Sequence, residues 1–186
     1  MSSGKRVMFI LNPIAGHGLN ENIVAVANET LSKYAIESVF KKTEFAGHAT
    51  TLAAEAVRDK VNLVVCVGGD GTVNETAQVL KDSETALAII PTGSGNGLAR
   101  HLRIPMDYKK AIALLIEGKQ VAIDTFLVNG RFAVNLVGVG FDALVAHRFA
   151  ALKVRGLKSY INTVIRSMSD VEEMNFMDAE EKQQRE

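Results

Sequence analysis

Short apolar runs alternate with helical patterns along the chain as far as residue 117. The run at 61–67 is apolar at nearly every position, as expected for a strand covered on both faces. Segments such as 48–60 instead repeat apolar residues at helical spacing. This alternation predicts an α/β fold, in which an open, mostly parallel sheet carries helices on both faces. The expected strands are 7–11, 36–42, 61–67 and 86–90, and the expected helices are 20–34, 48–60, 72–81, 97–102 and 108–117.

The pattern changes after residue 120, where two apolar runs follow one another directly. Residues 121–128 and 131–137 are predicted to be strands. The Asn129-Gly130 pair between them is typical of a tight type I′ turn. A hairpin does not continue the strand–helix repeat, so it marks the start of a different domain.

We therefore predict two domains, an α/β domain over 1–125 and a second domain over 126–186. Helices are expected at about 142–152 and 157–168, followed by a charged tail. A hairpin with two helices is too little for an independent domain. The second domain is therefore expected to be the start of a truncated, mainly β domain, and the open hairpin edges favour self-association, for which a homodimer is one arrangement.

Composition excludes several classes of protein. The chain has 186 residues, of which 47% are hydrophobic and 23% charged, as in ordinary globular proteins. Lys plus Arg and Asp plus Glu both total 21, and such a balance argues against a nucleic-acid partner. The single cysteine, Cys66, excludes a disulfide framework and is expected to be a buried, inert thiol.

No apolar run approaches the roughly 18 residues of a membrane span. The first apolar run ends at Asn12-Pro13 and is too short for the core of a signal peptide. We expect a cytoplasmic protein, with peripheral contact to a membrane surface left open. A stretch rich in basic residues, which includes Arg148 and Lys158, suits phosphate groups or anionic lipids.

Four glycine-rich segments follow expected strands, three in the sheet and one after the hairpin. An open α/β sheet binds ligands at the carboxyl ends of its strands. Glycines let backbone N–H groups approach an anion closely, and the helix behind each loop adds its positive end. Their convergence on one edge therefore predicts phosphate binding. The segments are 12–18, 68–75, 91–97 and 138–143.

Three familiar glycine motifs do not explain these loops. No Gly-Lys-Ser/Thr ending of a P-loop occurs. Ser94 has Thr92 two residues before it, where a nucleophile elbow requires glycine. The Gly138-x-Gly140-x-x-Ala143 match to a dinucleotide fingerprint follows a hairpin and lacks the acid that would hold a ribose, so we interpret it as chance.

Asp70 is the strongest candidate for a catalytic or metal-binding residue. A carboxylate among glycines would repel phosphates unless Mg²⁺ or a proton intervenes, so it could hold a metal or accept a proton from an attacking hydroxyl. The alternative is a turn aspartate that caps the next helix. Because Thr72 is available as that cap, we favour the functional role.

The polar neighbours of Asp70 are less decisive. Thr72-x-x-Glu75 matches a capping box, so Glu75 either closes a helix N-terminus or serves the site. Ser94 and Asn96 either cap the helix at 97–102 or donate to phosphate. The four histidines show no ligand spacing, and the metal ligands stay unknown.

Three segments occur in the order and at the spacing of a known family: Asn12-Pro13 with Gly16, Gly68 to Glu75, and Pro91 to Asn96. From about residue 5 to 170 the chain resembles the diacylglycerol kinase catalytic domain, which bacterial lipid kinases share with sphingosine and ceramide kinases. The Gly-Gly-Asp-Gly-Thr element alone is similar to that of NAD kinases and phosphofructokinases. Its combination with Thr-Gly-Ser-Gly-Asn and the later Gly-Val-Gly-Phe-Asp is specific.

This resemblance implies a fold of the NAD kinase and diacylglycerol kinase type. It also implies ATP-dependent transfer of the γ-phosphoryl group to a lipid hydroxyl, of a diacylglycerol-like lipid at a membrane surface, with ATP and Mg²⁺ as cofactors. By resemblance, the nucleotide site lies between the α/β domain and the second domain.

The resemblance also assigns roles to individual residues. Asn12 and Thr43 would contact the nucleotide, Ser94 would reach it from the third loop, and Glu75 would support the phosphate loop. Asp70 matches the base proposed for the sphingosine kinase branch, and Asp142 matches a position that faces the lipid head group there. The residues that would cradle the phosphates are Gly68, Gly69, Asp70, Gly71, Thr72, Val73 and Asn74.

Family members are longer, and in bacterial members the further strands hold metal ligands and an acidic residue proposed as the base. Two interpretations of this chain follow. It is either a lipid kinase that uses Asp70 alone, or a non-catalytic nucleotide-binding or regulatory fragment. A third alternative is a soluble kinase of the NAD kinase type, which uses the same glycine loop.

Overall fold

The computed structural model describes residues 5–15, 20–138, 141, 143–145, 148 and 157–167. The chain groups into two compact units, Met1–Leu136 and Val137–Glu186. The elements of the first unit are β1 (Arg6–Leu11), α1 (Asn20–Ser32), β2 (Glu37–Lys42), α2 (His48–Arg58), β3 (Leu63–Gly68), α3 (Asp70–Leu80), β4 (Ala86–Pro91), α4 (Gly97–His101), α5 (Tyr108–Glu117), β5 (Phe126–Val128) and β6 (Arg131–Ala133).

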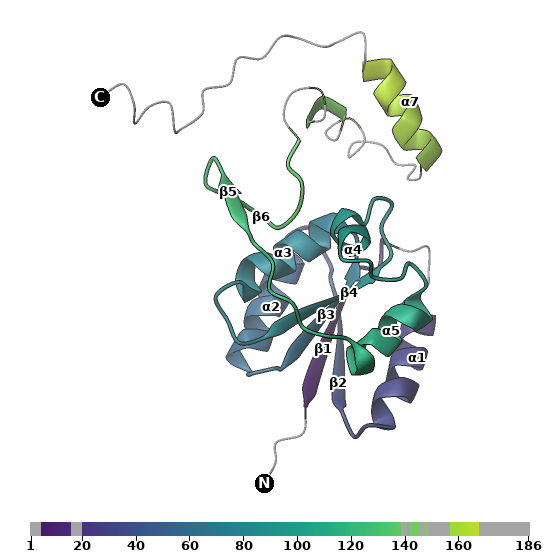
Figure 1. The fold of residues 1–186 in the computed structure, drawn as a ribbon, viewed down its shortest axis with the longest axis vertical. Coiled ribbons are helices and arrows are strands. Elements are labelled where there is room, and N and C mark those ends of the chain that lie inside the picture. Colours follow the sequence, from purple (N-terminus) through teal and green to yellow (C-terminus); the bar gives the residue numbers. More distant parts are fainter. Residues whose placement is uncertain are drawn as a thin grey trace, which may run out of the picture. The chain divides into compact units, whose positions relative to one another are not determined.

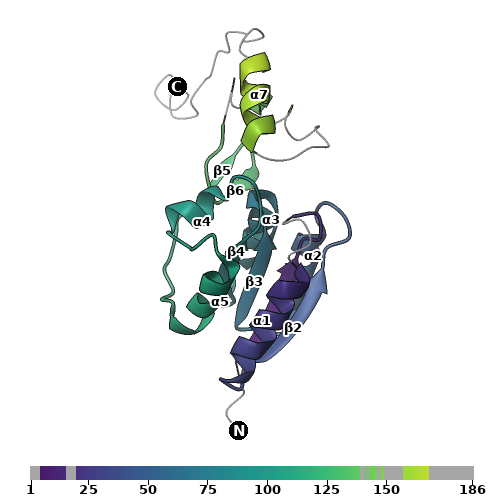
Figure 2. The same ribbon diagram turned by 90° about the vertical axis from the view of Figure 1, so that its right-hand side faces the viewer.

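The first four strands form one parallel sheet in the order β2-β1-β3-β4, which confirms the predicted α/β architecture. Helices α1 and α5 cover one face, and α2 and α3 cover the other (Figures 1 and 2). Ile23 of α1 and Ile112 of α5 are fully buried against the first face. Ala53 of α2 and Leu80 of α3 pack against the second. Each helix thus buries its apolar side on the sheet.

The strand order creates a switch point between β1 and β3. The chain leaves β1 toward β2 on one side of the sheet and later returns to place β3 on the other side. Crevices for ligands form at such points, outside the carboxyl ends of the strands. The backbone pairing continues just past the strand end, where Asn12 N–H donates to Val67 O at 2.9 Å. The residues after β1 and β3 are therefore neighbours.

Strand β3 is the most deeply buried part of the sheet. Val64 to Val67 have no exposed surface, which confirms the prediction that Cys66 is buried. Burial raises the pKa of the Cys66 thiol to about 12, a hydrogen bond with Thr76 opposes this shift, and the charge of Glu75 adds to it. The thiol is therefore protonated at neutral pH.

The hairpin is present but shorter than expected. Asn129 and Gly130 have φ angles of 49° and 73°, the two positive values that a type I′ turn requires. Strands β5 and β6 have three residues each, whereas 121–128 and 131–137 were predicted. The chain leaves the ribbon after Ala133, because Val134 N–H donates to the side chain of Asn74 on α3. The residues after Ala133, which would have paired with residues 121–125, are therefore held away from them, and the pairing ends at Phe126 and Ala133.

The second unit contains α7 (Leu157–Ser167), which confirms the helix expected over 157–168. Arg148 Nη1 donates to Ser167 Oγ at 3.1 Å within this unit. Most of the helix expected over 142–152 lies outside the described residues. No helix in the part of the chain that the structure describes has the length and apolar character to cross a membrane. The domain boundary between 125 and 126 stays a prediction.

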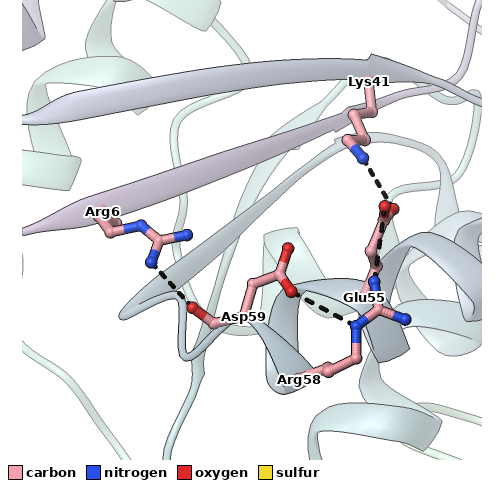
Figure 3. Close-up of polar contacts among 5 residues, drawn as sticks. All are labelled: Arg6, Lys41, Glu55, Arg58 and Asp59. Carbon is pink, nitrogen blue, oxygen red and sulfur yellow. Dashed lines mark hydrogen bonds and ion pairs between the residues drawn. The ribbon is translucent and has the colours of Figure 1, made fainter.

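Ion pairs attach α2 to the sheet (Figure 3). Lys41 Nζ on β2 lies 2.8 Å from Glu55 Oε2 on α2, and Arg58 reaches the other oxygen of Glu55 at 3.8 Å. Arg6 Nη1 on β1 donates to Asp59 O at 2.9 Å. These contacts bind the end of α2 to β1 and to the edge strand β2, whose outer side has no strand partner among the described residues.

Replacing Glu55 by Gln is expected to lower the free energy of unfolding by about 0.5–1 kcal/mol. The Lys41 and Glu55 side chains are only 32% and 29% exposed, so water screens their attraction incompletely. The matched control is Glu29→Gln, which breaks the well-exposed pair with Lys33 and should cost less. Urea denaturation at low and high salt measures both losses. Equal losses for the two variants would contradict a special role for Glu55.

We expect native Cys66 to resist thiol reagents at pH 8, because it is buried and protonated. Labelling by 5,5′-dithiobis(2-nitrobenzoate) should become fast only in denaturant, where β3 opens. The comparison of labelling rates with and without urea measures this. Rapid labelling of the folded protein would show that β3 is accessible.

Candidate functional site

All four parallel strands end at one edge of the sheet, and candidate residues follow each of them. Asn12 follows β1 and Thr43 follows β2, while Gly68 ends β3 and Ser94 lies shortly after β4. The strands are parallel, so these positions lie at the same edge. The predicted convergence is therefore found for residues 12–15 of the first loop and for the loops 68–75 and 91–97, while residues 16–18 lie outside the described residues.

Asn12 connects the loop after β1 to helix α3. Its Nδ2 donates to Thr72 Oγ1 at 2.9 Å, and its Oδ1 accepts from Ile14 N–H at 3.0 Å. Thr43 N–H donates to Leu11 O at 2.8 Å, which holds the end of β2 beside the end of β1. The structure thus joins Asn12 to Thr72 across the switch point of the sheet and holds Thr43 beside the end of β1.

The glycine loops after β3 and β4 touch through their backbones. A Cβ added to Gly93 would lie 2.5 Å from Gly69 Cα, a distance that real structures do not show. Thr92 N–H also donates to Gly68 O at 3.0 Å, so the loops stay paired beyond the strands. Glycine is required at 93 by this close approach and not by a positive φ angle, and a Cβ at 69 would lie a tight 3.2 Å from Gly93 Cα.

Asp70 begins α3 but caps a different helix. Its Oδ1 accepts the Gly97 N–H of α4 at 2.7 Å. Gly69 is the N-cap of α3 and makes no side-chain capping bond, and Thr72 lies inside the helix. The expectation that Thr72 is the cap is therefore wrong, because the helix starts two residues earlier than predicted. Asp70 Oδ2 accepts no hydrogen bond from the described residues, so one carboxylate oxygen stays available.

Glu75 forms no capping box with Thr72. Its Oε1 accepts the Gly47 N–H at 3.1 Å, and its backbone oxygen accepts from Thr50 Oγ1 at 3.4 Å. Glu75 therefore supports the loop between Thr43 and α2. The same loop is tightened by His48, whose ring stacks on Phe45 and whose Nδ1 accepts from a backbone N–H.

Asn74 and Asn96 use their amides on the backbone of neighbouring loops. Asn74 Nδ2 donates to Phe132 O, its Oδ1 accepts from Val134 N–H, and both distances are 3.2 Å. Asn96, at a φ of 52°, bonds both the N–H and the C=O of Gly93 and thereby closes the loop that carries exposed Ser94. Neither amide caps its own helix.

The remaining candidates are placed only in part. Asp142 lies outside the described residues. Among the side chains that are described, no three His, Cys, Asp or Glu residues come together to hold a metal ion. The structure adds Asn135, whose amide lies against Gly97 of α4. The sequence signal for it is a lone polar residue in the apolar run 132–137.

Residues 6–128 match the diacylglycerol kinase catalytic domain. A diacylglycerol kinase of Staphylococcus saprophyticus is 34% identical over 73% of this chain and 45% of its own length. One from Bacillus subtilis is 35% identical over 73% of this chain and 46% of its own. The crystal structure of a diacylglycerol kinase from Bacillus anthracis superposes with a TM-score of 0.62 at 30% identity, over 71% of this chain and 49% of that one. The chain thus spans less than half the length of these relatives.

The contact between the glycine loops predicts a large difference between two Gly→Ala variants. Gly93→Ala should lower the free energy of unfolding by about 1–3 kcal/mol, because the added methyl group meets the Gly69 backbone. The control, Gly71→Ala, meets nothing within 4 Å and lies in α3, so it should be neutral or stabilising by up to about 1 kcal/mol. Thermal denaturation measures both. Equal stability of the two variants would contradict the loop contact.

Proposed function

The chain belongs to the diacylglycerol kinase catalytic domain family, and on this basis we propose that it transfers the γ-phosphoryl group of ATP to a hydroxyl of a diacylglycerol-like lipid. The observation that carries this proposal is the meeting of glycine loops around Asp70 at the carboxyl edge of the sheet. Phosphoryl transfer depends on positioning and charge neutralisation, which such loops provide. Because the chain spans less than half of its relatives, the proposal covers the whole reaction or its nucleotide-binding portion.

In this proposal, the start of α3 holds the nucleotide. Backbone N–H groups in the first turn of this helix point toward the strand edge, where the positive end of the helix dipole favours phosphate. Asn12, Thr43 and Ser94 contact the nucleotide from the neighbouring loops, and Glu75 keeps the Thr43 loop in place through Gly47. The phosphate cradle consists of Gly68, Gly69, Asp70, Gly71, Thr72, Val73 and Asn74.

A magnesium ion would be bound at this edge together with the nucleotide. Mg²⁺ in kinases is commonly held by carboxylates, phosphate oxygens and water, and here phosphate oxygens and water would hold it while Asp70 serves as the base. When bound, the ion would neutralise charge on the phosphates.

We assign Asp70 as the base. The lipid hydroxyl gives its proton to Asp70 Oδ2 while its oxygen bonds to the γ-phosphorus, and the bond from that phosphorus to the β–γ bridging oxygen breaks to release ADP. The Gly97 N–H on Oδ1 fixes the orientation of the carboxylate. Asp142 is proposed to face the lipid head group, and the lipid acceptor implies that the protein works at a membrane surface.

The two other interpretations have less support. A non-catalytic nucleotide-binding fragment is not favoured, because the curated relatives that match the chain are diacylglycerol kinases. A soluble enzyme of the NAD kinase type has less support, because the chain matches the diacylglycerol kinase catalytic domain over residues 6–128. Self-association through the hairpin stays a prediction.

Asp70→Asn is expected to abolish lipid-dependent ADP release while keeping the wild-type melting temperature. The asparagine oxygen still accepts the Gly97 N–H, but the amide cannot take a proton from the hydroxyl. Asp70→Ala should also be inactive and, in addition, less stable by about 1 kcal/mol, because the α4 cap is lost. The assay is ADP release with Mg²⁺-ATP and detergent-dispersed diacylglycerol, sphingosine or a polyprenol, with NAD as a soluble acceptor.

The possible results separate the three interpretations. Turnover with a lipid and its loss in Asp70→Asn support the kinase. A rise in melting temperature with ATP but no turnover with any acceptor supports the nucleotide-binding fragment, and turnover with NAD alone supports the soluble kinase. Absence of both turnover and ATP binding would overturn the phosphate-loop proposal.

A further inference from the structure

The segment that follows β6 is fixed over the start of α3. Asn74 is one helical turn after Asp70, so the two side chains lie on the same side of the helix. The Asn74 amide bonds Phe132 O and Val134 N–H, which places residues 132–134 along that side. The next residue, Asn135, is therefore positioned by two hydrogen bonds immediately before it.

The Asn135 amide lies where Gly97 has no side chain. A Cβ added to Gly97 would be 2.5 Å from Asn135 Nδ2 and 3.6 Å from Asp70 Oδ1. Gly97 lacks the positive φ of Gly47 and Gly130, so its backbone conformation does not demand glycine. A methyl group at 97 would displace the Asn135 amide, which is the far end of a flexible side chain. This amide and Asp70 Oδ1 thus lie near the same point of α4, and Asp70 Oδ2 lies beside Gly95 in the preceding loop.

Both groups have hydrogen-bonding capacity left. Asn135 is half-buried and makes no hydrogen bond with the described residues, and Asp70 Oδ2 accepts none from them either. An N–H donor next to a carboxylate acceptor matches the two capacities of a hydroxyl group, which donates one hydrogen bond and accepts others.

We propose that Asn135 is a further substrate-contacting residue: its Nδ2–H donates to the oxygen of the acceptor hydroxyl, while Asp70 takes the proton of that hydroxyl. The inference rests on the proposed function and names the group that orients the acceptor in it. Asn135 makes and breaks no covalent bond. It fixes the hydroxyl oxygen so that the lone pair not used by the amide faces the γ-phosphorus.

The competing interpretation is that Asn135 only packs the hairpin segment onto α4. Two variants separate the alternatives. Asn135→Ala removes the donor and should lower kcat about tenfold, the effect of one hydrogen bond, without changing the rise in melting temperature caused by ATP. Asn135→Asp keeps the shape but adds a carboxylate beside Asp70, which disfavours the ionised form of Asp70 and should move the acidic limb of the pH–rate profile to higher pH.

Two further variants test the contact itself and the specificity of the effect. Gly97→Ala should displace the Asn135 amide and lower kcat, and adding Asn135→Ala to it should cause little further loss, because the amide has already left its position. Asn28→Ala is the matched control, since Asn28 is an exposed residue of α1 away from the carboxyl edge of the sheet, and its loss should leave kcat unchanged.

The outcomes are separable from those for the proposed function. Lipid turnover that is unchanged in Asn135→Ala, or an acidic limb that Asn135→Asp does not move, would overturn the role of Asn135 and leave the kinase proposal intact. Absence of lipid turnover by the unchanged protein would overturn both. Reduced kcat in Asn135→Ala together with the shifted limb in Asn135→Asp would establish the inference, whether or not Asn135→Ala is also less stable.

Discussion

The candidate site depends on the direct contact between the backbones of Gly69 and Gly93. Parallel pairing of β3 with β4 carries both chains to the same edge, and the pairing continues through Thr92 N–H and Gly68 O. No side chain fits between the two loops. The first turn of α3 and the loop after β4 are therefore held together, and a ligand that binds one of them lies beside the other.

Polar side chains at this edge bond mainly to the backbone of other loops. Asp70 binds the first N–H of α4, Glu75 binds the N–H that precedes α2, and Asn74 binds the hairpin. Each of these residues belongs to α3, so this one helix aligns three neighbouring segments. Such cross-bonding gives a preorganised site, in which little rearrangement is needed when charge develops during phosphoryl transfer.

The sequence predicted the parallel sheet and the edge at which candidate residues meet, because apolar runs and glycine-rich turns are local signals. The turn at Asn129-Gly130 could also be predicted from the sequence, because a type I′ turn needs a positive φ at both positions and Asn and Gly adopt it most readily. The partner of Asp70 could not be predicted. A capping aspartate was expected to bond to an N–H of its own helix, yet Asp70 accepts the N–H of Gly97, which lies 27 residues further along the chain. The short hairpin and the position of Asn135 have the same cause, because both depend on bonds from Asn74 that no local pattern reports.

The amide of Asn74 takes the place of a neighbouring strand along β6. A strand offers the C=O of one residue and the N–H of the second residue after it to the same side, and Asn74 satisfies this pair at Phe132 and Val134. The outer edge of β6 is thus closed to pairing by a side chain of a helix. Further strands, from this chain or from a second one, can therefore pair only with the outer edge of β5, where Phe126 and Leu127 are exposed.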